Sequence, residues 1–180
     1  MHITQVRTTP VLASLPRPVR TASGNIDRFP LVLIDVETDA GVVGRAYAQV
    51  YLPELLPALN QTVCSLAEMA KGLALEPRDV HAHLLRRCRL FGMKGMLGVA
   101  LGGLDMALWD AWARARCEPL ARALGAELRP LKAYHSVGLY DAQTVVKIAE
   151  ETLAAPAACT AIAEGLHESL EIIAQHGLDP

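Results

Sequence analysis

The chain opens with a run of residues that favour an extended backbone. Residues 2–14 are rich in Thr and Val, which predicts an extended segment. Pro16 and Pro18 are expected to interrupt it, because proline cannot donate a backbone hydrogen bond to a neighbouring strand. A polar, glycine-containing stretch over residues 20–28 follows and predicts a loop.

The clearest local pattern comes next. Residues 31–38 and residues 42–48 are both rich in apolar and β-branched side chains, and a short Asp/Gly sequence at residues 39–41 separates them. Two such runs around a tight turn are typical of a β-hairpin. The first third of the chain therefore predicts a small antiparallel sheet.

Apolar residues then recur at helical spacing. Proline is well suited to the first position of a helix and glycine to its end, so both mark the expected boundaries. The pattern predicts four helices. The first begins near Pro53, the second begins at Pro77, the third spans residues 97–111, and the fourth runs from Pro119 to Gly125.

The order of elements changes after Arg129. A strand is expected over residues 131–137, a helix capped by Asp141 over residues 142–154, a short apolar run over residues 157–163, and a helix that ends at Gly177. Alternating strands and helices begin a parallel α/β arrangement, and a full barrel of eight such units needs about 250 residues. We therefore predict an α+β fold. Residues 1–129 form an antiparallel sheet followed by a helical bundle, and residues 130–180 form an incomplete α/β barrel segment.

Composition narrows the functional class. The formal net charge is −2 and 52% of the residues are hydrophobic, which suits a soluble globular protein and gives no basic surface for nucleic acid. No apolar stretch approaches the roughly 18 residues that a membrane span requires, and no secretory signal is apparent. The cysteines form no Cys-x-x-Cys pair and are expected to be buried and reduced, so we expect a cytoplasmic protein. They are Cys64, Cys88, Cys117 and Cys159.

One stretch, ALGGLDMALWDAWA at residues 100–113, resembles the amino-terminal signature of the mandelate racemase/muconate lactonizing enzyme family of the enolase superfamily. The hairpin sequences at residues 30–35 and 41–44 resemble that family too, and so do the segments that follow the signature. The resemblance extends from residue 2 to about residue 155. It implies the superfamily's capping domain followed by the start of its barrel.

The residue types of this signature indicate a structural role. The small residues would let the helix approach its neighbour closely, and the leucines would fill the contact. Asp105 and Asp110 could bind backbone amides or arginine side chains, and catalytic roles are not expected for them. The small residues are Ala100, Gly102, Gly103 and Ala107, and the leucines are Leu101, Leu104 and Leu108.

The resemblance also implies a mechanism. Family members bind a substrate carboxylate to Mg²⁺, which stabilises the enediolate formed when a base removes the α-proton. The metal ligands are three acidic residues on later barrel strands, and the bases are a Lys-x-Lys lysine on the second strand and a later histidine. Residues 157–163 contain no lysine, and neither Lys132 nor Lys147 occupies that position. We therefore expect no catalytic residue and no metal ligand in this chain, and no Mg²⁺ bound by it.

Substrate-contacting positions are carried over from the resemblance alone. The stretch at residues 20–28 corresponds to a mobile flap over the family's active site. Each position is either a specificity residue or an ordinary residue of an exposed loop or strand, and the pattern leaves both open. The positions are Thr21, Ser23, Ile26, Tyr51 and Ser136.

The resulting interpretation is a truncated mandelate racemase-like protein. The intact family catalyses Mg²⁺-dependent α-proton abstraction from 2-hydroxy acids or sugar acids, which leads to racemisation or dehydration. The alternative is a non-catalytic α+β domain for association or for binding small acids. We expect a small carboxylate as substrate of the intact family, and homo-oligomers. The sequence after Ala155 fits the family poorly, as a divergent segment, a deletion junction or a shifted reading frame would.

Overall fold

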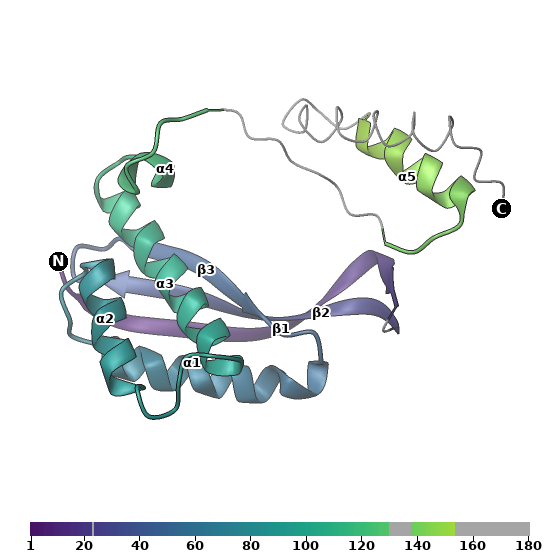
Figure 1. Ribbon diagram of the computed structural model, residues 1–180. Coiled ribbons are helices and arrows are strands. Elements are labelled where there is room, and N and C mark those ends of the chain that lie inside the picture. Colours follow the sequence, from purple (N-terminus) through teal and green to yellow (C-terminus); the bar gives the residue numbers. More distant parts are fainter. Residues whose placement is uncertain (23, 130–137, 154–180) are drawn as a thin grey trace. The chain divides into compact units, whose positions relative to one another are not determined.

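The computed structural model describes residues 1–22, 24–129 and 138–153. Three strands form one sheet in the order β1-β2-β3, and helices follow them along the chain (Figure 1). This order confirms the predicted fold class for the first part of the chain. The elements are β1 (Ile3–Thr21), β2 (Gly24–Thr38), β3 (Val43–Gln49), the 3₁₀ helix η1 (Pro53–Leu55), α1 (Leu56–Ala70), α2 (Pro77–Arg87), α3 (Met96–Ala115), α4 (Leu120–Ala123) and α5 (Ala142–Leu153).

The chain divides into two compact units. The first comprises Met1–Ser14 and Arg28–Glu127, and it holds the body of the sheet with helices α1 to α4. The second comprises Leu15–Asp27 and Leu128–Pro180, and its described part holds the tip of the β1–β2 hairpin and α5. The predicted strands at 131–137 and 157–163 lie outside the described residues, and the predicted boundary between residues 129 and 130 stays a prediction.

The predicted hairpin is confirmed by the pairing of β2 with β3. The strands are antiparallel, with Leu33 opposite Tyr47 and Asp35 opposite Arg45. Gly41 has a φ of +75° in the turn, a conformation that favours glycine. The Thr38 hydroxyl donates to the Val42 carbonyl oxygen at 2.9 Å, so a side-chain hydrogen bond also joins the two ends of the turn.

The start of the chain differs from the prediction. Pro16 and Pro18 do not interrupt the first strand, and most of residues 20–28 extend the hairpin instead of forming a loop. The position of β1 explains the difference, because it lies at an edge of the sheet. An edge strand has one side without a partner strand, so a residue that lacks a backbone N–H is tolerated there.

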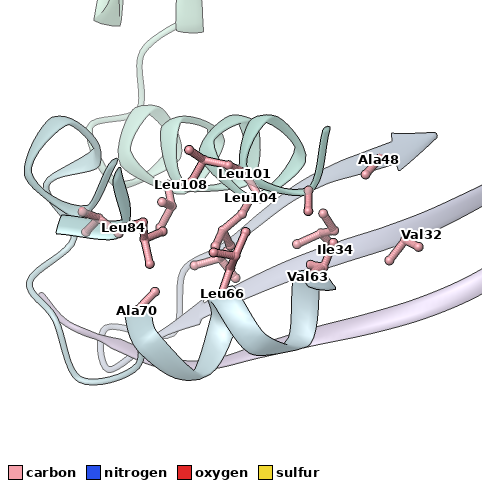
Figure 2. Close-up of a cluster of buried hydrophobic side chains, with 14 of the residues drawn as sticks. Val32, Ile34, Ala48, Val63, Leu66, Ala70, Leu84, Leu101, Leu104 and Leu108 are labelled. Carbon is pink, nitrogen blue, oxygen red and sulfur yellow. The ribbon is translucent and has the colours of Figure 1, made fainter. Parts of the chain in front are cut away.

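The core lies between one face of the sheet and the helices of the first unit. Ile34 and Val32 of β2 are fully buried, and Leu104 of α3 lies among them with residues of α1 (Figure 2). The other two signature leucines, Leu101 and Leu108, are buried in the same cluster, as predicted. Burial of this apolar face, at about 25 cal/mol per Å², is the main force that holds the helices to the sheet.

The signature glycines are expected to let α3 approach the sheet closely. The structure confirms this expectation for Gly103 but not for Gly102. A Cβ atom at Gly103 would lie 2.8 Å from the Ala48 Cβ and 2.9 Å from the Ile34 Cδ1. A Cβ atom at Gly102 would meet no atom of a neighbouring element within 4 Å, so the prediction that Gly102 serves close packing is wrong. In β3, a Cβ at Gly44 would overlap the backbone of α3, so both sides of this contact depend on glycine.

The cysteines differ in environment. Cys88 is buried and Cys64 is half-buried, whereas Cys117 is exposed and has a φ of +52°. The expectation of buried cysteines is therefore wrong for Cys117, which lies in the turn after α3. Cys159 lies outside the described residues. Among the helices that the structure describes, none is both long enough and apolar enough to cross a membrane.

Candidate functional site

Two of the expected substrate-contacting residues lie at the tip of the β1–β2 hairpin. Thr21 ends β1, and its hydroxyl donates to the Gly24 carbonyl oxygen at 2.9 Å, which closes the tip. Gly24 has a φ of +133°, which favours glycine at this reversal. Ile26 lies two residues further along β2 and is half-buried. Ser23, between them, lies outside the described residues.

Tyr51 lies in the short connection between β3, which ends at Gln49, and η1, which begins at Pro53. Its side chain is 74% exposed, so it is accessible to a ligand. Tyr51 belongs to the first unit and the hairpin tip to the second, so their convergence on one ligand stays a prediction. Ser136 lies outside the described residues.

The hairpin tip contacts the segment that leads into α5, which the sequence did not predict. The Leu139 amide donates to the Arg20 carbonyl oxygen at 2.9 Å. The Arg20 guanidinium carbon lies 5.0 Å from the centroid of the Tyr140 ring. In addition, the Arg17 guanidinium donates to a Glu151 carboxylate oxygen at 2.8 Å. The sequence separation of Arg17 and Glu151 is 134 residues, and no periodic pattern connects them.

Two carboxyl groups in this segment have lowered pKa values. The hydrogen bond from Arg17 lowers the pKa of Glu151, because it stabilises the carboxylate. The pKa of Asp141 is lowered by hydrogen bonds from the Thr144 hydroxyl, at 2.7 Å, and from the Thr144 amide, at 2.9 Å. Asp141 thus caps α5, as predicted, and remains ionised down to lower pH than a free aspartate.

The signature aspartates bind protein groups. One Asp110 carboxylate oxygen accepts hydrogen bonds from the Arg45 amide at 2.8 Å and from the Arg114 Nε at 2.6 Å. These contacts confirm the prediction that Asp110 binds a backbone amide and an arginine side chain. Asp105 differs, because its partner is the Nδ1 atom of His81 at 3.1 Å.

The described residues offer no metal centre. In residues 1–22, 24–129 and 138–153, no three side chains of His, Cys, Asp or Glu come together in a way that could hold an ion. Mg²⁺ prefers several oxygen ligands in octahedral geometry, which isolated pairs such as His81 and Asp105 do not supply. The described residues therefore do not fit the metal that the resemblance implies.

The chain is similar in sequence to a known protein family and to one of its characterised members. Residues 3–125 match the family model for the mandelate racemase/muconate lactonizing enzyme N-terminal domain. A D-galactarolactone cycloisomerase from Agrobacterium fabrum (strain C58 / ATCC 33970) is 29% identical over 153 residues, which cover 83% of this chain and 39% of that protein.

Two solved structures are also similar to this chain. An enolase from Bradyrhizobium, in complex with magnesium and mandelic acid, is 38% identical with a TM-score of 0.78, and the match covers 85% of this chain and 42% of the other. An enolase from alphaproteobacterium bal199 with bound magnesium is 34% identical with a TM-score of 0.77, over 84% of this chain and 43% of the other. The chain thus spans about two fifths of the length of these relatives.

Proposed function

Because the chain belongs to the mandelate racemase/muconate lactonizing enzyme family, we propose that it forms the capping part of an active site for small carboxylic acids. The observation that carries the proposal is the family match over residues 3–125, which includes the β1–β2 hairpin. The substrate class that we propose is a 2-hydroxy acid or a sugar acid, and the reaction is removal of the proton next to the carboxylate.

The capping residues would select and enclose the substrate. Thr21 and Tyr51 offer hydroxyl groups that can bind the hydroxyls of such an acid, and Ile26 offers an apolar contact. We include Ser23 and Ser136 in this set on the family resemblance alone. Enclosure matters because removal of water strengthens every electrostatic interaction with the developing negative charge.

The substrate class is supported by two relatives. The Bradyrhizobium structure holds mandelic acid, a 2-hydroxy acid, together with magnesium. The name of the Agrobacterium relative describes an enzyme that acts on a sugar-acid lactone. In an enzyme of this kind Mg²⁺ would stabilise the enediolate, and the remainder of a barrel would supply its ligands. This 180-residue polypeptide contains no Lys-x-Lys pair, and we expect it to turn over no substrate by itself.

A domain exchange tests the proposal. Residues 1–153 would replace the matching segment of the Bradyrhizobium enolase, so that the segment in contact with the hairpin tip is retained. The chimera would be assayed with Mg²⁺ and a panel of 2-hydroxy acids and sugar acids. The proposal expects turnover, and it expects Thr21→Ala and Tyr51→Phe to raise KM more than they lower kcat. A matched control is Thr4→Ala, which changes an exposed β1 threonine far from the hairpin tip along the strand. A folded chimera without any turnover would contradict the proposal.

A further inference from the structure

Three contacts of different kinds join the end of β1 to the segment before and within α5. They are the backbone hydrogen bond from Leu139 to Arg20, the stacking of the Arg20 guanidinium on Tyr140, and the ion pair between Arg17 and Glu151. All three lie within the second compact unit. A single surface ion pair contributes little to stability, but a backbone hydrogen bond and a stacked arginine add geometric precision.

Gly138 allows the backbone of its segment to approach the backbone of β1. A Cβ atom at this position would lie 2.9 Å from the Arg20 carbonyl oxygen and 3.3 Å from the Arg20 nitrogen. Its φ is +82°, a region that side chains rarely adopt. The backbone of β1 therefore rests directly on the backbone at Gly138, and any side chain here would push the two apart.

Tyr140 contributes through its ring. The ring lies under Arg20, whereas its hydroxyl oxygen is buried without a hydrogen-bond partner among the described residues. A buried hydroxyl without a partner costs free energy and stabilises nothing. The contact between Arg20 and Tyr140 therefore depends on the ring and not on the hydroxyl. Phenylalanine would preserve the stacking surface, and alanine would remove it.

We propose that Gly138, Tyr140 and Glu151 are positioning residues, which hold the hairpin tip in place through Arg17 and Arg20. The segment that carries Gly138 and Tyr140 follows the predicted first barrel strand, and loops at that end of barrel strands form the catalytic face. The hairpin tip carries Thr21 and Ile26, so its anchorage sets where these side chains meet a substrate. This last step rests on the proposed function, whereas the anchorage itself does not.

Limited proteolysis of the full 180-residue chain tests the anchorage. Trypsin can cleave after Arg20, but it cleaves poorly after Arg17 because Pro18 follows. Cleavage of a folded chain tracks the population of the locally opened state. Gly138→Ala and Tyr140→Ala should each accelerate cleavage after Arg20 several-fold, whereas Tyr140→Phe should leave the rate at the wild-type value.

Gly125→Ala is the matched control for Gly138→Ala. Gly125 has a φ of +83°, nearly equal to that of Gly138, but a Cβ there would meet no atom within 4 Å. Both substitutions strain the backbone, and only one of them disturbs the hairpin tip. We expect Gly125→Ala to leave cleavage after Arg20 unchanged.

Hydrogen exchange of the Leu139 amide supplies a second measurement. This amide donates to the Arg20 carbonyl, so it should exchange faster in Gly138→Ala, Tyr140→Ala and Glu151→Gln. The charge reversal Arg17→Glu with Glu151→Arg should restore the protection that either single reversal removes. Unchanged cleavage and unchanged exchange in both Gly138→Ala and Tyr140→Ala would overturn the proposal. Neither measurement needs substrate or metal, so its outcome is independent of the domain exchange.

Discussion

Two adjacent glycines in α3 have opposite surroundings. Gly103 is buried against Ala48 and Ile34, and Gly102 faces open space. Gly103→Ala should lower the free energy of unfolding by about 1–3 kcal/mol, because the added methyl group overpacks the core. Gly102→Ala should raise it by roughly 0.5–1 kcal/mol, because alanine favours the helix. Urea denaturation of both variants checks the pair, and equal effects would contradict the assignment of these glycines to different environments.

Asp110 makes a different single-residue contribution. Its carboxylate accepts hydrogen bonds from the Arg45 amide in β3 and from Arg114 in α3. Asp110→Ala leaves the Arg45 amide without this acceptor, so we expect a loss of about 1–2 kcal/mol in the free energy of unfolding.

Arg114→Ala removes only the exposed i,i+4 pair and serves as the control. It should cost about 0.3–0.5 kcal/mol. If the two variants were equally stable in urea denaturation, the hydrogen bond to the Arg45 amide would contribute nothing measurable.

At the scale of elements, α5 depends on a cap that titrates. Asp141 accepts hydrogen bonds from Thr144, and its pKa lies below the ordinary value of 3.8. A lowered pKa means that the stabilising effect is complete above pH 3.8 and is lost as the pH falls through the lower, folded-state pKa. Protection of the Thr144 amide from hydrogen exchange should therefore hold at pH 5 and decline below about pH 3.8.

Asp141→Asn separates this cap from other acidic groups in the same pH range. Asparagine retains the oxygen acceptor but does not titrate, so it should remove the pH dependence while it preserves the helix start. The pKa of Glu151 is also lowered, and that group stays unchanged in the variant. A pH profile of Thr144 exchange identical to that of the wild type would contradict the assignment of the titration to Asp141.

Most of the elements in the first unit could be predicted because their signals are local. The proline at the start of α2 and the apolar spacing of α3 need only a few neighbouring residues to be interpreted. The continuation of β1 through Pro16 and Pro18 could not be predicted, because it depends on the edge position of the strand, which is a property of the whole sheet.

Physical patterns in the sequence predict the residues of the candidate site less well than they predict the helices and strands. Only the family resemblance points to Thr21 and Tyr51, since a single hydroxyl residue in a polar segment has no distinctive spacing. The contact between Arg17 and Glu151 was not predicted, because nothing in the sequence connects residues 134 positions apart. Gly138 carried a weak signal, since a glycine shortly before a helix cap often marks a special backbone conformation.

At the scale of the whole molecule, every residue of the main hydrophobic core belongs to the first unit. Among the residues that the structure describes, none beyond Glu127 belongs to this core. A chain that ends at Glu127 should therefore keep the unfolding midpoint of the 180-residue chain. The two tryptophans provide a selective probe, because Trp109 and Trp112 both lie in α3, with ring centroids 5.5 Å apart. Thermal unfolding followed by tryptophan fluorescence should give coincident, cooperative transitions for the two chains. A clearly lower midpoint in the shorter chain would mean that residues after Glu127 stabilise the first unit, and the core would then extend beyond the residues assigned to it.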